Sequence, residues 1–237
     1  MLVDVGVAKI RKYASRESGD TLEMVERPHG GLSFVLADGQ RSGRAAKLIS
    51  NIAARKAVTL LAEGARDGVA ARAAHDYLYS VRRGQVRADL QILSVDLQTH
   101  TLVISRNTEC PALLVDEGSL QWLDQPAQPI GLYRQTRPVI VEYPLKVGLG
   151  AVIFTDGLMK AGLRKERPLD VYAETAALLA KSVEATEAQA VADGLLSRAL
   201  ELEGGLARDD MSVVVLLIRP HTETHEIRRL HVEFPIP

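Results

Sequence analysis

The sequence predicts an α+β domain, a four-layer α-β-β-α sandwich in which two mainly antiparallel sheets are flanked by helix pairs. Strands and helices come in blocks and do not alternate strictly, which argues against a parallel Rossmann-type sheet. Helices follow one another without an intervening strand at two separate places. The last strong strand is a continuous apolar run, MSVVVLLI, which is typical of a strand buried on both faces.

The first clear elements are a hairpin and a helix pair. Residues 22–27 and 32–38 are short apolar runs on either side of the turn sequence PHGG, which indicates a hairpin. Residues 42–63 have apolar side chains at helical spacing, with Ser42 at a capping position and Gly64 at the end. Residues 67–81 predict a second helix directly afterwards.

The rest of the chain supplies the remaining layers. We expect strands at residues 89–96, 101–105, 112–115, 120–123, 137–143 and 151–155, helices at 169–183 and 186–202, and a final strand at 211–218. No linker is visible, so we expect a single domain over residues 1–237. Residues 219–237 are expected to form either an added edge strand or a contact tail.

Composition excludes several classes of protein. Charged residues make up 25% of the chain and the formal net charge is −1, so the sequence gives no sign of a nucleic-acid-binding face. One cysteine permits no internal disulfide and fits a reducing compartment. Charges interrupt the N-terminal apolar residues, and no stretch approaches the roughly 18 apolar residues of a membrane span. We therefore expect a cytoplasmic protein without membrane contact.

Acidic residues stand at the ends of several predicted strands. Asp20 precedes the first hairpin strand, Asp38 ends the second, Asp156 follows a buried strand, and Asp209 and Asp210 precede the last one. If these strand ends share one edge, the carboxylates converge, and a divalent cation would relieve their repulsion. Oxygen ligands without a Cys or His cluster favour Mg²⁺ or Mn²⁺ over Zn²⁺. Asp-Gly is also a common turn dipeptide, so spacing alone leaves turn chemistry open.

An ordered set of short motifs adds a family resemblance. The motifs are Ser-Gly-Asp at 18–20, Leu-Ala-Asp-Gly at 36–39, Gly-Arg-Ala-Ala at 43–46, Pro-Ile-Gly at 129–131, Phe-Thr-Asp-Gly at 154–157 and Arg-Asp-Asp-Met-Ser at 208–212. With them the chain resembles the stage II sporulation protein E-like serine/threonine phosphatases, the bacterial branch of the metal-dependent type 2C protein phosphatases. The resemblance covers about residues 18–218, and the fold it implies is a β-sandwich flanked by paired helices.

The resemblance also implies roles for the acidic residues. Asp38 matches the carboxylate that bridges two metal ions, Mn²⁺ or Mg²⁺. Asp20 and the Gly39 carbonyl match groups at the second metal, and Asp156 and Asp209 match the remaining ligands of the first, with Asp210 as a second choice. Asp38 and Asp156 would thus be catalytic. The implied substrate is a phosphoprotein such as a phosphorylated anti-sigma-factor antagonist in a bacterial partner-switching circuit.

Two departures from the family pattern lie close in sequence to these residues. Arg41 and Ser42 replace a common Gly-His, and Glu109 replaces a frequent histidine two residues before Pro111. Arg41 and Arg44 are candidates for binding the substrate phosphate, because guanidinium groups offer paired donors. The alternative is that both are solvated arginines at the start of a helix.

The sequence therefore predicts hydrolysis of phosphoserine or phosphothreonine by a water activated by two metal ions. Two alternatives stay open. In the first, the chain is a catalytically weak member of the fold that acts as a binding module. In the second, it is a two-metal phosphohydrolase that acts on a small phosphoester.

Overall fold

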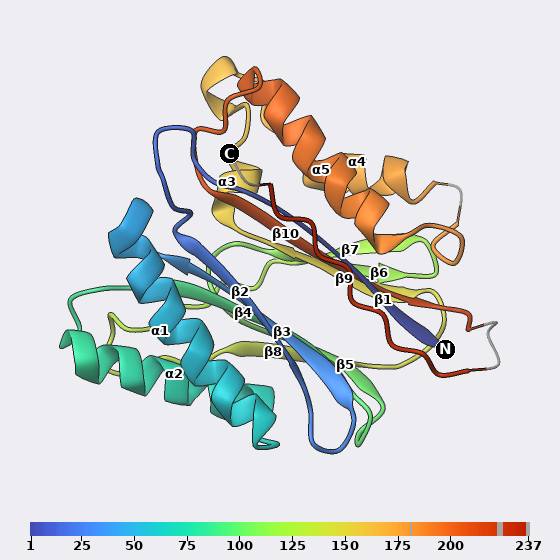
Figure 1. The fold of residues 1–237 in the computed structure, drawn as a ribbon, viewed down its shortest axis with the longest axis horizontal. Helices are drawn as coiled ribbons and strands as arrows, with labels where there is room; N and C mark the ends of the chain where they lie inside the picture. Colours follow the sequence, from blue (N-terminus) through green and yellow to red (C-terminus); the bar gives the residue numbers. More distant parts are fainter. Residues whose placement is uncertain (181, 222–224, 236–237) are drawn as a thin grey trace.

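The computed structural model describes residues 1–180, 182–221 and 225–235, which contain two five-stranded antiparallel sheets. Figure 1 shows the sheets stacked between helices. In spatial order, the first sheet consists of β1 (Leu2–Ile10), β10 (Met211–Arg219), β9 (Leu149–Phe154), β6 (Ala112–Asp116) and β7 (Ser119–Leu123). The second consists of β2 (Asp20–Glu26), β3 (Gly31–Gly39), β4 (Ala88–Asp96), β5 (Thr101–Asn107) and β8 (Val139–Pro144).

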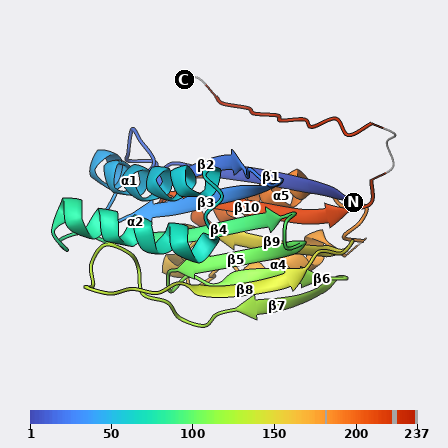
Figure 2. The ribbon, with the colours of Figure 1, turned by 90° about the horizontal axis from the view of Figure 1, so that it is seen from below.

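Helices cover the outer face of each sheet, which confirms the predicted four layers (Figures 1 and 2). The long helices α1 (Gly43–Ala62) and α2 (Asp67–Arg82) pack on the second sheet. The helices α4 (Val171–Leu178) and α5 (Ala188–Glu203) pack on the first sheet. The short helix α3 (Asp156–Met159) and the 3₁₀ turn η1 (Leu163–Lys165) link β9 to α4.

Strand β10 shows that the first sheet is buried on both faces. Val213 and Val215 belong to the core beneath α4 and α5, whereas Val214 and Leu216 belong to the core between the sheets. Because successive strand residues point to opposite faces, a continuous apolar run fills two cores. This confirms the burial predicted from its sequence.

The register of the second sheet places its polar end. Leu22 of β2 lies opposite Leu36 of β3, and two residues further along Asp20 lies opposite Asp38. Asp38 in turn lies opposite Asp89 of β4. Residues two apart share a face of the sheet, so the three aspartates continue the face that carries Leu22 and Leu36. The layer between the sheets thus ends in carboxylates.

Three local details differ from the expectations. Strand β1 was not predicted, because its main evidence is pairing with β10 at the far end of the chain. Ser42 occupies the N-cap position of α1, but its side chain makes no capping hydrogen bond. Helix α4 is shorter than expected; Asp170 caps it by accepting from the Ala173 N–H at 2.9 Å.

The C-terminal tail forms no strand where it is described, at residues 220–221 and 225–235. Figure 2 shows the backbone of the tail running above β1 and β2, and the Arg228 guanidinium forms an ion pair with the Glu26 carboxylate at the end of β2. None of the helices in the described ranges is long and apolar enough to cross a membrane.

Candidate active site

A row of three carboxylates forms one wall of the site. Asp20, Asp38 and Asp89 come from adjacent strands and lie directly opposite one another in the register. Like charges in opposed positions destabilise a sheet, so this row costs folding free energy while the carboxylates are charged. Such an unfavourable row at the end of a well-packed sandwich indicates a binding role.

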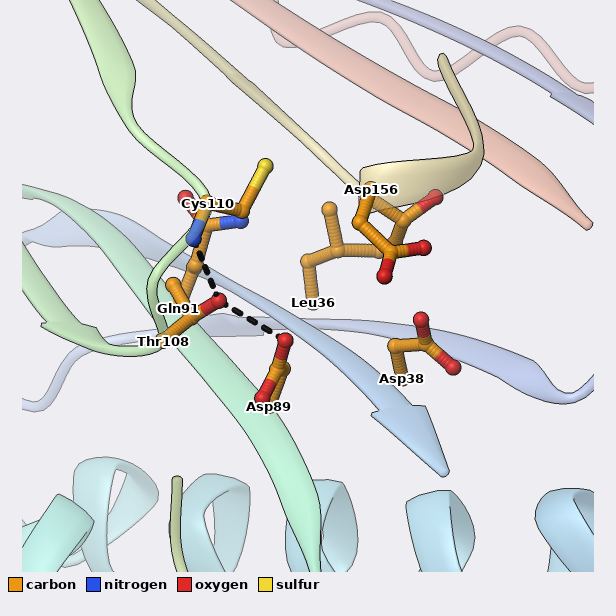
Figure 3. A pocket seen from close by; sticks show the side chains of 8 residues that line it. Leu36, Asp38, Asp89, Gln91, Thr108, Cys110 and Asp156 are labelled. Carbon is orange, nitrogen blue, oxygen red and sulfur yellow. Dashed lines mark hydrogen bonds between the residues drawn. The ribbon is translucent and has the colours of Figure 1, made fainter. Parts of the chain in front are cut away.

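The second wall comes from the other sheet. Asp156 begins α3 directly after β9, and Asp209 lies in the loop before β10. Figure 3 shows Asp38, Asp89 and Asp156 around one narrow cleft, whose other lining residues include Thr108 and Cys110. The structure thus brings Asp20, Asp38, Asp156 and Asp209, predicted from separate motifs, to the same end of the sandwich.

Asp38 has the most perturbed electrostatics of the group. Burial and then the charges of Asp20 and Asp156 raise the pKa of Asp38 to about 9. None of the described residues donates a hydrogen bond to its carboxylate. A half-buried carboxylate without a donor, beside other carboxylates, is a group that needs a cation.

Asp20 is held more firmly. One carboxylate oxygen, Oδ2, accepts hydrogen bonds from the Ser212 hydroxyl at 2.6 Å and the Thr155 hydroxyl at 3.0 Å. The other oxygen, Oδ1, is buried and has no hydrogen-bond partner among the described residues. Burial raises the pKa of Asp20 to about 6. Two hydroxyl groups thus fix the carboxylate and leave one oxygen free for a ligand.

The two neighbours before β10 have different environments. Asp210 is buried and its carboxylate accepts the backbone N–H groups of Lys12 at 2.9 Å and Gly19 at 2.8 Å. Burial raises the pKa of Asp209, and Asp156 adds to that effect. Asp210 therefore ties the loop before Asp20 to β10, whereas Asp209 faces the acidic group. This geometry favours Asp209 as the ligand, and the assignment stays a prediction.

Glycines in the motifs allow the elements around the site to approach closely. A Cβ on Gly39 would come within 2.0 Å of the Ala46 carbonyl oxygen in α1, and one on Gly157 within 2.1 Å of the Asp210 carbonyl oxygen. Gly131 has φ 88° and its N–H donates to His75 Nδ1 at 3.0 Å. Gly131 therefore holds a loop against α2, away from the carboxylates.

Lysines partly balance the carboxylates. Lys9 and Lys47 both donate to the Asp20 backbone carbonyl, at 2.6 and 2.7 Å. Burial lowers the pKa of both ammonium groups. The Lys9 residue as a whole is nevertheless exposed to solvent. Lys160 forms an ion pair with the Asp156 carboxylate one turn earlier in the chain. These lysines were not predicted, because their spacing in the sequence gives no sign that they converge.

The donor set fits a hard divalent cation in its chemistry, because it is made of carboxylate oxygens with an orphaned oxygen on Asp20 and a strongly perturbed Asp38. These carboxylates do not, however, surround a common position at which one ion could be coordinated. Within the described ranges, no three carboxylate, imidazole or thiol groups are grouped so that they could hold one ion. Asp156 would have to leave Lys160 to join such a cage.

The remaining candidates lie at the rim. Arg41 and Arg44 are both exposed. Arg41 has φ 81°, a left-handed conformation that glycine adopts more easily, so a side chain at this position strains the turn. Glu109 is exposed and its charge contributes to raising the pKa of Asp89, an effect led by burial.

Asp89, Thr155 and Ser212 are site residues that sequence reasoning missed. Thr155 and Ser212 stand inside motifs that were used only for resemblance. Asp89 opens a predicted strand, and only the register with Asp38 shows that it belongs to the site. Its carboxylate accepts from the Thr108 hydroxyl at 2.8 Å, drawn as a dashed line in Figure 3.

Comparison with known proteins gives the family. Residues 28–219 match the family model of stage II sporulation protein E. The chain belongs to this family. Curated members of the stage II sporulation protein E family from Priestia megaterium and Bacillus subtilis are 21% and 22% identical over 93% of this chain. The chain spans 37% and 26% of their lengths, so it corresponds to about a third of those relatives.

Solved structures agree on the fold. The phosphatase domain of stage II sporulation protein E from Bacillus subtilis, with a fragment of its regulatory domain, has a TM-score of 0.78 at 22% identity, covering 94% of this chain and 64% of that chain. The RsbU and RsbW domains of a Mycobacterium tuberculosis protein give 0.74 at 19% identity, covering 93% and 61%. The catalytic domain of the phosphatase PstP, in complex with two manganese ions, gives 0.69 at 13% identity, covering 92% and 99%. This stage II sporulation protein E family member therefore has the type 2C phosphatase fold.

Proposed function

We propose that this chain is a metal-dependent protein serine/threonine phosphatase that hydrolyses phosphoserine or phosphothreonine. The observation that carries the proposal is the carboxylate group around Asp38, which brings together acidic residues from both sheets at an open end of the sandwich. Family membership supports the same activity. The cleft beside this group is narrow and is lined mainly by polar side chains.

Asp38 would hold both ions, with Asp20 and the Gly39 carbonyl at the second metal and Asp156 and Asp209 at the first. Asp89 extends the same row and is a further candidate ligand or a support for one. When bound, two Mn²⁺ or Mg²⁺ ions supply charge neutralisation for the phosphoryl oxygens and lower the pKa of a water molecule. Ser212 and Thr155 orient Asp20, and Asp210 fixes the loop that leads into it.

We further propose a phosphoprotein substrate in bacterial partner-switching signalling, of the kind represented by a phosphorylated anti-sigma-factor antagonist, and a cytoplasmic location. Support comes from the family and from the neighbour that carries RsbU and RsbW domains. Asp38, Asp89 and Asp156 are only half-buried, so a side chain presented by a folded partner can reach them. Arg41 and Arg44 are exposed nearby in sequence and are available to contact the phosphate or the partner.

The experiment measures phosphate release from a phosphoserine protein, from a phosphopeptide and from a nucleotide, each with Mn²⁺, with Mg²⁺ and with chelator. We expect turnover of the phosphoprotein with metal and none with chelator. Full activity in chelator would refute the metal requirement. Binding of the phosphoprotein without turnover would favour a binding module, and preferred turnover of the nucleotide would favour a small-phosphoester hydrolase.

A further inference from the structure

The described part of the C-terminal tail is amphipathic with the two-residue period of a strand. Leu230, Val232 and Phe234 alternate with polar residues, and their exposed fractions are 75%, 84% and 83%. A period of two places these three side chains on one face of an extended chain. Three large apolar side chains on one face, all in water, indicate a segment that lacks its docking surface.

We propose that residues 228–234 add as an antiparallel strand to the free edge of β2 in the same chain, and so close the open side of the sandwich. β2 is the edge strand of its sheet, with β3 on one side. The proposal concerns the tail alone and goes beyond the proposed phosphatase activity.

Alternate residues of β2 direct their backbone N–H and C=O groups away from β3, toward the free edge where a further strand would bind. The Arg27 N–H donates across the hairpin to the Gly31 carbonyl at 3.0 Å, so Arg27 faces β3. In an antiparallel pair this orientation alternates, so Leu22, Met24 and Glu26 direct their N–H and C=O groups to the free edge. Asp20 has the same phase, and its carbonyl accepts from Lys9 and Lys47 in place of a strand.

The side chains at this edge form an apolar rim. Leu22 and Met24 are half-buried and pack against the core between the sheets, as do Val3 and Val5 of β1. The edge of β1 is less available for a new strand, because the Val7 N–H and C=O are both hydrogen bonded to the Gln189 side chain of α5, at 3.0 and 2.9 Å. β2 is therefore the better acceptor of the two.

One existing contact sets the register. The Arg228 guanidinium forms an ion pair with the Glu26 carboxylate. Keeping this pair in the docked strand would put the two residues opposite each other. Counting along an antiparallel pair then places Leu230 opposite Met24 and Val232 opposite Leu22. Opposed residues point to the same face, so the apolar side of the tail meets the apolar rim.

A register shifted by one residue would instead turn His231 and Glu233 toward that rim. The charge pair and the apolar alternation, which are independent features, thus agree on one register. In it Phe234 lies opposite Asp20, at the edge of the acidic site.

Hydrogen exchange of the full-length chain tests the docking. We compare the wild type with the variant L230S/V232S and with the matched control H231S/E233S, which changes the other face of the tail. We expect the amides of Leu22, Met24 and Glu26 to exchange about tenfold faster in L230S/V232S, because their edge hydrogen bonds are lost, and no change in the control. Equal exchange of these three amides in all three proteins would overturn the proposal.

A disulfide tests the register and the choice of occupant. Glu23 and His231 would be opposed at a non-hydrogen-bonded position, where Cα atoms lie closest and a disulfide is accommodated. We expect E23C/H231C to form a bond within one chain, and V25C/H231C, two residues out of register, to form it at least several-fold more slowly. Equal rates for the two variants, or a bond that joins two copies of the chain, would contradict the proposal. Cys110 is buried and stays out of the reaction.

Discussion

The layer between the two sheets has an apolar interior and an acidic end. They are formed by neighbouring pairs of opposed residues on the same sheet face, and we call each such pair a rung. Leu22 and Leu36 face each other inside the layer, and two residues further along Asp20 and Asp38 face each other in the same geometry. The inner rung stabilises the fold by burying hydrocarbon. The outer rung opposes folding while its carboxylates are charged. The difference shows how a site can be made by changing the last rung of a core without altering its backbone.

The largest expected effect is on catalysis at the acidic rung. Asp38→Asn removes a charge and an oxygen donor from the residue assigned to both ions, so turnover should fall by about 10³-fold or more, of the order seen when a major electrostatic contribution is removed. Steady-state phosphate release at saturating Mn²⁺ measures it. The fold should persist, which a melting curve in chelator checks. Near-normal turnover of Asp38→Asn would remove the two-metal assignment.

Leu36→Ala tests the apolar rung and should act on stability. Leu36 is 1% exposed, and truncating a buried leucine costs about 2–5 kcal/mol. Urea unfolding with and without the substitution gives the difference in free energy. Leu36 also lines the cleft but offers no donor atom to a metal, so metal affinity should stay near the wild-type value at temperatures where the variant is folded. A large loss of metal affinity without a loss of stability would contradict the claim that the apolar pair stabilises the fold and only the acidic pair binds metal.

The pH dependence of the metal-free protein separates the two rungs further. The pKa of Asp38 is raised to about 9 in the folded protein, above its ordinary value of 3.8, so the folded state favours the protonated form. This contribution to stability is full below about pH 4 and is lost as the pH rises through about 9. The melting temperature in chelator should therefore fall between pH 6 and pH 8.5, and fall less in Asp38→Asn. An equal fall in melting temperature with pH in both proteins would show that a group other than Asp38 causes it.

The smallest expected effect comes from Asp210, beside the acidic rung. Asp210→Asn places an amide where two backbone N–H groups now find acceptors, so one of them loses its partner, at about 1–3 kcal/mol. Urea unfolding in chelator measures this cost. Turnover at saturating Mn²⁺ should fall far less than in Asp38→Asn. Greater damage to turnover from Asp210→Asn would reverse the assignment of Asp209 as the ligand.

Local sequence predicted the layers and most of the acidic residues, because both depend on short patterns. Apolar runs and helical spacing marked the strands and helices, and strand-end aspartates marked the site. The missed features depend on contacts between distant segments. β1 is defined by pairing with β10, and Lys9 and Lys47 converge only after β1, β2 and α1 are assembled. Asp89 becomes a site residue only through its register with Asp38.

The most direct test of the account is calorimetric titration of the metal-free protein with Mn²⁺. The account predicts two bound ions per chain in the wild type, and a rise in melting temperature with metal concentration because the ions bind the folded state. In Asp38→Asn the paired binding should be lost, and in Asp210→Asn it should remain. Two ions bound with unchanged affinity in Asp38→Asn, or no binding to the wild type, would contradict the claim that this carboxylate group is a two-metal site.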